Sequence, residues 1–439
     1  MQEDISDIRC LDLGKNIMKE NFYLLDYLKN NKAYSEEVLE IFKSKLDEKV
    51  YSYGAQFKFP YETRKVKKFS LGFYVRFIKI LFTRHKIKKL KGKSIVSNAY
   101  FSMNDELRNI GYSVMTPPWG FSRDSFTIPD LKLLKEYYKF SFLIEKSTYS
   151  EMLTKEFYNE YLNFKMIYKN SMQKQKIFAV CVPSDKNVWD RISIKIAKEL
   201  NISTFIFSHG LPGVYNPNDD TRADYLVVWG EKIKQNFIKY GHNSKSIYIS
   251  GHPLYQKLHY DNLRNSFDDI LIITHSMGQA QTDADVILSD RGNCALYLYM
   301  VENVLQKFGV KKACYRPHPS ENGLWYTKFI DNDFYTLDTA SLSESLSKRT
   351  LIIGPTSTVF LESFFYGVNY IIFEPSTNNI DVMNYPLIPP FDGSEKDVIV
   401  TKNEDELYQV LNDKCVQSKD FINRYVSDTF SLDFIKELV

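Results

Sequence analysis

Short apolar runs typical of β-strands alternate with amphipathic runs typical of α-helices along most of this chain. Parallel strands need a long crossover between them, so this alternation predicts parallel sheets covered by helices. In the first part of the chain the helix-type runs are 191–200 and 232–240. The strand-type runs there are 95–101, 177–182, 204–208, 225–229 and 247–250. The predicted fold class is α/β.

A second series of the same kind begins near Asp268. Its strand-type runs are 270–274, 312–316, 350–353 and 370–373, and its helix-type runs are 294–308, 358–366 and 404–411. Residues 251–265 lie between the two series and are interpreted as a connection. Two such series predict two Rossmann-like domains, which we expect to face each other across a cleft.

The length of the chain supports this division, because 439 residues exceed what one ordinary hydrophobic core organises. We expect a helical and basic N-terminal extension over 1–93 and a first Rossmann-like domain over 94–260. A second Rossmann-like domain should cover 266–415. A helix over 416–439 should then pack back on the first domain.

Positive charge is concentrated in one segment of a chain whose net charge is only +3. From Arg64 to Lys93 there are twelve Lys and Arg residues and no Asp or Glu, and an apolar run, 69–82, lies among them. Such a segment fits an anionic membrane surface, a solvated helix face or nucleic acid. The first two interpretations are favoured, and no nucleic-acid partner is expected.

Cysteine usage and the N-terminus predict a cytoplasmic location, and the basic segment 64–93 adds the expectation that the protein is peripheral on the inner face of the plasma membrane. The five cysteines are scattered without a C-x-x-C pair, which argues against a disulfide framework and a zinc site. The chain begins Met-Gln-Glu-Asp, without the basic and apolar regions of a signal peptide. No run of eighteen apolar residues is present, so no transmembrane helix is expected.

Two motifs in the C-terminal third combine a strand-type run with polar residues at its end. One is Lys-Ala-Cys-Tyr-Arg-Pro-His-Pro over 312–319, and the other is Leu-Ile-Ile-Gly-Pro-Thr-Ser-Thr over 351–358. The second leads into a helix-type run, and free N–H groups at such a turn attract phosphate. A histidine nearby can add a proton or a positive charge. Together they predict a site for a nucleotide-activated donor.

These motifs resemble those of a known group of enzymes. His318-Pro319 and Ser357-Thr358 are similar to the His-Pro and Ser-Ser/Thr motifs of bacterial sialyltransferases, polysialyltransferases and Kdo transferases, which have the GT-B fold. The resemblance covers about 177–375. It implies a glycosyltransferase that uses a CMP-sugar without a metal or other cofactor. The acceptor would be a surface glycan or glycolipid, in capsule or lipopolysaccharide biosynthesis.

The resemblance also implies roles for individual residues. His318 would act on the donor phosphate, with Arg316 and Pro319 beside it, and Thr356, Ser357 and Thr358 would cradle the phosphate. Glu362 would bind the ribose hydroxyls, and Gly278 would let the backbone approach the phosphate. These enzymes often carry an acidic D/E-D/E-G motif that supplies the base, and this chain lacks it. His209 is the first candidate base and Asp190 is a rival.

Other functions fit parts of the same pattern. CDP-glycerol or CDP-ribitol phosphotransferases also pair a histidine with a Ser/Thr turn. The run 207–213, Phe-Ser-His-Gly-Leu-Pro-Gly, resembles the His-Gly turn of capsule-biosynthesis proteins and UDP-GlcNAc 2-epimerases, so a UDP-sugar enzyme is a further alternative. A non-catalytic protein of polysaccharide assembly is the last alternative function.

Overall fold

The computed structural model forms two compact units. The N-terminal unit holds 63–253 and 426–439, together with 21–46, and the C-terminal unit includes 254–425. The structure describes residues 37–39, 41, 71–87, 93–99, 103–120, 126–184, 188–208, 210–211, 223–255, 263–274, 284–319, 323–377, 380–383, 387–418 and 420–439. Most of the predicted N-terminal extension, 1–93, therefore lies outside the described residues.

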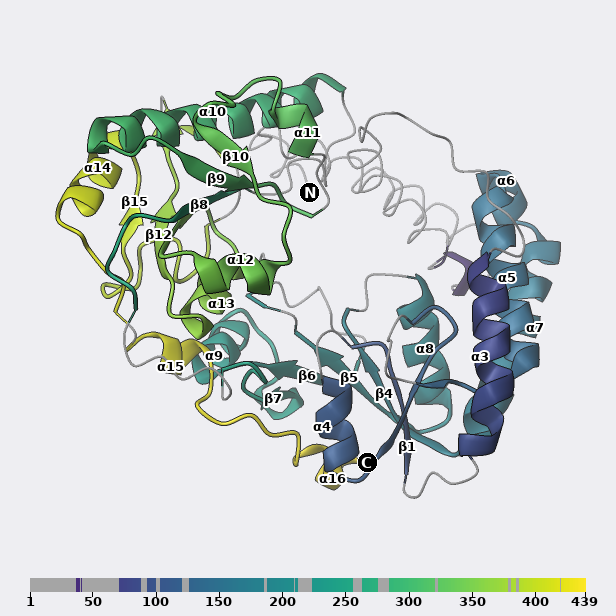
Figure 1. Ribbon diagram of the computed structural model, residues 1–439. Helices are drawn as coiled ribbons and strands as arrows, with labels where there is room; N and C mark the ends of the chain where they lie inside the picture. Colours follow the sequence, from purple (N-terminus) through teal and green to yellow (C-terminus); the bar gives the residue numbers. More distant parts are fainter. Residues whose placement is uncertain are drawn as a thin grey trace. The chain divides into compact units, whose positions relative to one another are not determined.

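The N-terminal unit is built on one parallel sheet with the strand order β3-β2-β1-β4-β5-β6-β7 (Figure 1). The order runs outward in both directions from β1 and β4, which places the topological switch point between these two strands. Its strands are β1 (Ser94–Ser97), β2 (Ser113–Thr116), β3 (Phe126–Thr127), β4 (Ile177–Val182), β5 (Ser203–Phe207), β6 (Tyr225–Val228) and β7 (Ile247–Ile249).

Two long helices of this unit, α5 and α7, begin where side chains cap their free N–H groups. Asp130 Oδ1 accepts hydrogen bonds from the backbone N–H of Lys132 and of Leu133 at the start of α5, and Thr154 caps α7. The described helices of the unit are α3 (Leu71–Ile87), α4 (Met103–Asn109), α5 (Leu131–Lys146), α6 (Tyr149–Met152), α7 (Lys155–Lys174), α8 (Val188–Glu199), α9 (Glu231–Lys239) and α16 (Ile435–Leu438).

The C-terminal unit has a second parallel sheet, with the order β10-β9-β8-β11-β12-β15 (Figure 1). Its central strands are buried along their whole length, which explains their unbroken apolar sequence. The strands are β8 (Ile270–Ile273), β9 (Ala313–Arg316), β10 (Tyr335–Leu337), β11 (Leu351–Gly354), β12 (Asn369–Phe373) and β15 (Val400–Thr401). A short antiparallel pair, β13 (Ser376–Thr377) and β14 (Ile380–Asp381), follows β12.

The helices of the C-terminal unit contribute a core in which α10 packs with α14. They are α10 (Ala284–Phe308), α11 (Gly323–Tyr326), α12 (Leu342–Lys348), α13 (Val359–Phe365), α14 (Glu404–Asn412) and α15 (Ile422–Tyr425). Two parallel sheets with crossover helices confirm the predicted α/β class with two Rossmann-like units. Within the described residues, no helix is long and apolar enough to cross a membrane.

The prediction of one helix over 416–439 is wrong. Among the described residues of this range the structure has two short helices, α15 and α16. Between them, Ser427 Oγ accepts a hydrogen bond from Thr429 N at 3.3 Å, and Ser431 Oγ accepts one from Asp433 N at 3.1 Å. Such local bonds offer the backbone an alternative to the helix. Residues 426–439 do join the N-terminal unit, where Ser431 N donates to Ser250 O at 2.9 Å.

Gly251 allows this last segment to lie against β7 and its loop. Its φ is +72°, and a Cβ built there would lie 2.2 Å from the carbonyl oxygen of Thr429. We expect Gly251→Ala to lower the free energy of unfolding of the N-terminal unit by about 2 kcal/mol or more, because it adds a backbone clash to the strain of positive φ. Chemical denaturation would measure this change.

The matched control is Gly111→Ala. Gly111 has a φ of +103°, but a Cβ there would meet no atom within 4 Å. The control therefore carries the cost of positive φ alone, about 1 kcal/mol. Equal destabilisation by both substitutions would show that the contact with Thr429 does not constrain the C-terminal segment.

Candidate functional site

The candidate site lies where the strand order of the C-terminal sheet reverses, between β8 and β11. Loops after such neighbouring strands diverge and leave a ligand site at their carboxyl ends. Gly354, the last residue of β11, is essential to this packing, because a Cβ there would lie 2.4 Å from both Ile273 Cγ1 and Tyr370 Oη. Tyr370 Oη in turn donates to Pro355 O at 2.6 Å. The turn after β11 is thus fixed on the sheet.

Thr356 anchors this turn through a carboxylate that follows β12. Its backbone N–H and its hydroxyl both donate to Glu374 Oε1, the hydroxyl at 2.6 Å. Both side chains are buried, with exposed fractions of 6% for Thr356 and 4% for Glu374. The structure therefore gives Thr356 a structural partner, while its predicted contact with phosphate stays a prediction.

Ser357 and Thr358 are half-buried and have donors to spare. Ser357 Oγ accepts a hydrogen bond from Val359 N at 3.2 Å, and Thr358 is the N-cap of α13 without a side-chain cap bond. In the described part of the chain, the backbone N–H groups of these two residues make no hydrogen bond. Because α13 has only seven residues, its dipole adds little, and what this turn offers an anion is its individual N–H and O–H donors.

Glu362 lies one turn further along α13 and differs from the other acidic groups of the site. Its side chain is half-buried, and its carboxylate has no hydrogen bond or ion pair among the described residues. Burial raises the pKa of Glu362 to about 7. An unpaired, desolvated carboxyl about one helical turn from a residue with a free N–H donor is typical of a functional site rather than of a structural ion pair.

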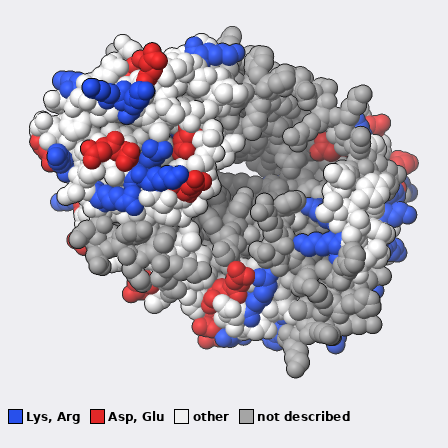
Figure 2. All heavy atoms as spheres, viewed as in Figure 1, with Lys and Arg blue, Asp and Glu red and all other residues white. Residues whose placement is uncertain are grey.

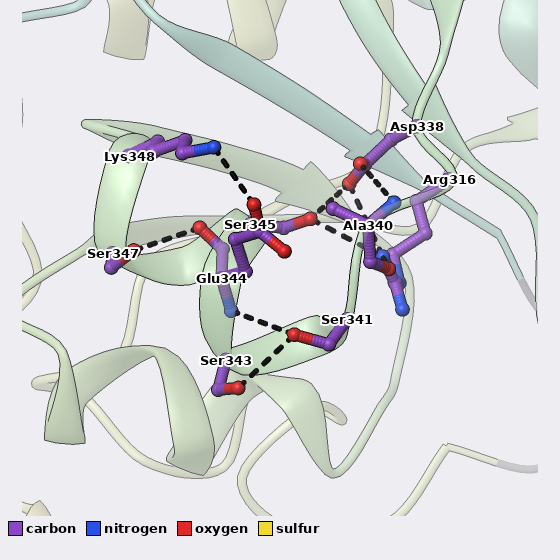
Figure 3. Close-up of polar contacts among 9 residues, drawn as sticks. All are labelled: Arg316, Asp338, Ala340, Ser341, Ser343, Glu344, Ser345, Ser347 and Lys348. Atoms are coloured by element: carbon purple, nitrogen blue, oxygen red, sulfur yellow. Dashed lines mark hydrogen bonds and ion pairs between the residues drawn. The ribbon is translucent and has the colours of Figure 1, made fainter.

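Arg316 ends β9 and is held by groups of its own unit (Figure 3). Its Nη1 lies 3.2 Å from Asp338 Oδ2, 2.8 Å from Ala340 O and 3.2 Å from Ser345 Oγ. Asp338 is 5% exposed and follows β10, and Ser345 comes from α12. The ion pair with Asp338 neutralises the charge of Arg316 and joins β9, β10 and α12 in one network. The predicted role of Arg316 in donor binding stays a prediction.

Two further predicted residues of the C-terminal unit follow β9 at the same edge of the sheet. His318 is half-buried and Pro319 is exposed, two and three residues after the end of β9. Gly278 lies outside the described residues, although β8, which precedes it, and Thr274 are described. Thr274 Oγ1 lies 3.1 Å from Tyr315 Oη, so the end of β8 is fixed to β9.

The two candidate bases belong to the N-terminal unit. His209 lies outside the described residues. Asp190, in the first turn of α8, is 0% exposed. Its Oδ1 accepts hydrogen bonds from Trp119 Nε1 at 3.1 Å and from Asn98 Nδ2 at 3.3 Å. Asn98 follows β1, so Asp190 lies at the switch point of its sheet, in a buried hydrogen-bonding position. Its role as a base stays a prediction.

Two acidic residues that organise the site were not predicted from the sequence. Glu374 directly follows β12, and Asp338 directly follows β10. The signal for Glu374 was available, because an acidic residue directly after an apolar strand lies at the ligand edge of a parallel sheet. Among the described residues no group of three or more His, Cys, Asp or Glu side chains could hold a metal ion. The prediction that no metal is needed stays untested.

No family model matches the sequence, and no curated protein matches it. Solved structures similar to the chain include a Methanocaldococcus jannaschii UDP-GlcNAc 2-epimerase in complex with UDP-GlcNAc and UDP, with 15% identity, a TM-score of 0.48 and coverage of 79% of this chain and 98% of that one. Another is the wall teichoic acid polymerase TagF, with 11% identity, a TM-score of 0.42 and coverage of 84% and 97%. A third is the lipopolysaccharide outer core galactosyltransferase WaaB, with 10% identity, a TM-score of 0.38 and coverage of 79% and 97%.

Proposed function

We propose that this chain is a glycosyltransferase of the GT-B type that takes its sugar from a nucleotide-activated donor bound to the C-terminal unit. One observation carries this proposal: Ser357 and Thr358 keep free N–H and O–H donors at the turn after β11, and the unpaired carboxyl of Glu362 follows Thr358 by four residues, about one helical turn. The N–H and O–H donors can hydrogen-bond a phosphate, and the carboxyl can accept hydrogen bonds from ribose hydroxyls. Together these groups match the two polar parts of a nucleotide.

For the donor we propose a CMP-activated 2-keto-3-deoxy sugar, either sialic acid-like or Kdo. This choice is supported by the His318-Pro319 and Ser357-Thr358 motifs. The acceptor would be a bacterial surface glycan or glycolipid. In the reaction, an acceptor hydroxyl oxygen attacks the anomeric carbon, and the bond from that carbon to the phosphate oxygen breaks. CMP leaves with the electron pair, and the configuration inverts.

Each candidate residue then has one task. His318 stabilises the charge that grows on the leaving phosphate, as a proton donor or a cation. Ser357 and Thr358 hold that phosphate, and Glu362 positions the ribose. The hydroxyl proton of the acceptor goes to a base of the N-terminal unit, His209 or Asp190. Near-normal transfer by a folded His318→Ala variant would contradict its assignment.

A UDP-sugar enzyme is the second candidate, because the phosphate donors and the carboxyl of this site do not distinguish cytidine from uridine. A CDP-linked phosphotransferase would also leave CMP, but phosphate would enter its product. Thermal unfolding with CMP, CDP and UDP separates the nucleotides, since a ligand of the folded state raises Tm by mass action. We expect the largest shift with CMP. A shift with UDP alone would favour the UDP-sugar enzyme.

The contact between Glu362 and ribose can be tested with a ligand that lacks the hydroxyls. Removing them, in 2′,3′-dideoxy-CMP, should weaken binding to the unmodified protein by about tenfold, the effect of a lost hydrogen bond to a charged group. The same ligand change should cost the Glu362→Gln variant much less. Calorimetric titration of both proteins with both ligands gives the coupling free energy between the Glu362 carboxyl and the ribose hydroxyls.

Ser343→Ala serves as a control for this test, because Ser343 is an exposed serine of α12. It should leave both affinities unchanged. If the affinity for dideoxy-CMP fell below the affinity for CMP by the same factor in the unmodified protein and in Glu362→Gln, the carboxyl would not contact the ribose.

A further inference from the structure

Helix α3 has two faces, and both are apolar. Phe73, Arg76, Phe77 and Ile80 follow one another at helical spacing and face the unit, where Ile80 is fully buried. Phe73 packs edge-on against Tyr138 of α5, with ring centroids 5.2 Å apart. The guanidinium of Arg76 donates to Gly120 O at 3.3 Å, in the loop after β2. The helix is therefore held in a fixed rotation.

That rotation turns a second apolar stripe toward solvent. Leu71 is 80% exposed, and four further side chains at helical spacing are about half exposed: Tyr74 54%, Val75 57%, Ile78 52% and Leu81 45%. Single exposed apolar residues are ordinary, but five on one helix face form a continuous surface. A helix that is apolar on both sides is normally covered on both sides.

Charge identifies the kind of surface that can cover this stripe. The segment from Arg64 to Lys93, which contains α3, has twelve Lys and Arg residues and no acidic one. In the space-filling view, Lys and Arg side chains occur in the same region of the molecule as α3 (Figure 2). The partner must therefore offer both apolar contact and negative charge.

We propose that the outer stripe of α3, formed by Leu71, Tyr74, Val75, Ile78 and Leu81, docks on an anionic lipid surface. The helix would lie in the plane of the membrane, with this stripe inserted at the boundary of the headgroups and the cations near the phosphates.

Other partners satisfy only half of these conditions. Nucleic acid would meet the positive charge, but exposed aliphatic side chains offer it no contact. A second copy of this chain would meet the apolar stripe, but it would bring a second set of twelve cations against the first. The lipid surface is also independent of the proposed reaction, so it holds whichever nucleotide the C-terminal unit binds.

The test uses the full chain and lipid vesicles in flotation assays. One set of vesicles contains phosphatidylglycerol and phosphatidylethanolamine, and the other contains phosphatidylcholine alone. We expect binding to the anionic vesicles only, with weaker binding at high salt. The double variant Val75→Glu/Ile78→Glu should bind these vesicles at least about tenfold less tightly, since two apolar contacts are lost and two negative charges are added.

The matched control is Met166→Glu, which changes an apolar residue of α7 with an exposed fraction of 53% in the same unit. It should leave vesicle binding unchanged, and a thermal unfolding curve of each variant verifies folding. Four outcomes would overturn the proposal. Three are equal binding to both kinds of vesicle, no loss in the double variant, and a dimer in light scattering that the double variant dissociates. The fourth is binding to duplex DNA without binding to vesicles.

Discussion

Glu374→Ala is expected to lower the free energy of unfolding of the C-terminal unit by about 3 kcal/mol. The substitution removes the acceptor of two buried donors, the N–H and the hydroxyl of Thr356. Each buried donor that loses its partner costs about 1 to 3 kcal/mol. Hydrogen exchange of β11 and β12, followed by mass spectrometry, measures this unit separately from the other one.

The turn that presents Ser357 and Thr358 depends on the same contact. Loss of the anchor should therefore weaken nucleotide binding as well as stability. Glu374→Gln is the control, because the amide keeps an acceptor oxygen for both donors, and most of the stability should remain. Thr356→Val removes only the hydroxyl and should cost about 1 kcal/mol. Glu374→Ala with unchanged exchange of β11 and β12 would rule out the anchoring role.

Strands were predictable from the sequence where burial makes them uninterrupted apolar runs. The prediction for 177–182 coincides with β4, and those for β8, β9 and β12 differ from the structure by one residue at one end. The prediction for β11, 350–353, is shifted by one residue at both ends. Strands β2 and β10 were missed. They are three or four residues long, and β10 reads Tyr-Thr-Leu with an exposed threonine at its centre. Such strands are stabilised by their neighbours in the sheet rather than by their own composition.

The position of the candidate site was also predictable, but the tasks of its residues were not. A Ser/Thr turn after a buried strand indicates the ligand edge of a parallel sheet. Which hydroxyl anchors the turn depends on Glu374, which is eighteen residues away from Thr356 and is brought there by the pairing of β11 with β12. The same holds for Arg316, whose partner Asp338 arrives through the pairing of β9 with β10.

Glu362→Gln is expected to stabilise the C-terminal unit at about pH 8, by up to about 3 kcal/mol, and to have little effect near pH 4.5. Burial raises the pKa of Glu362 from 4.5 to about 7 in the folded chain. Between these two values the folded chain binds more protons than the unfolded chain, so its stability falls as the pH rises. Each unit of pKa shift corresponds to about 1.4 kcal/mol. The amide carries no charge at any pH and therefore avoids this loss.

Hydrogen exchange of β11 and β12 at several pH values, with and without the substitution, gives the difference directly. Glu344→Gln is the control, since Glu344 is exposed and its ion pair with Lys348 lies on the surface, where such pairs contribute little. If Glu362→Gln stabilised the unit equally at every pH, ionisation of the Glu362 carboxyl would not be what destabilises the fold. A stability gain that rises between about pH 4.5 and about pH 7, as predicted, would instead mean that the fold keeps a destabilising carboxyl in place. This is expected where a ligand supplies the hydrogen bonds of that carboxyl.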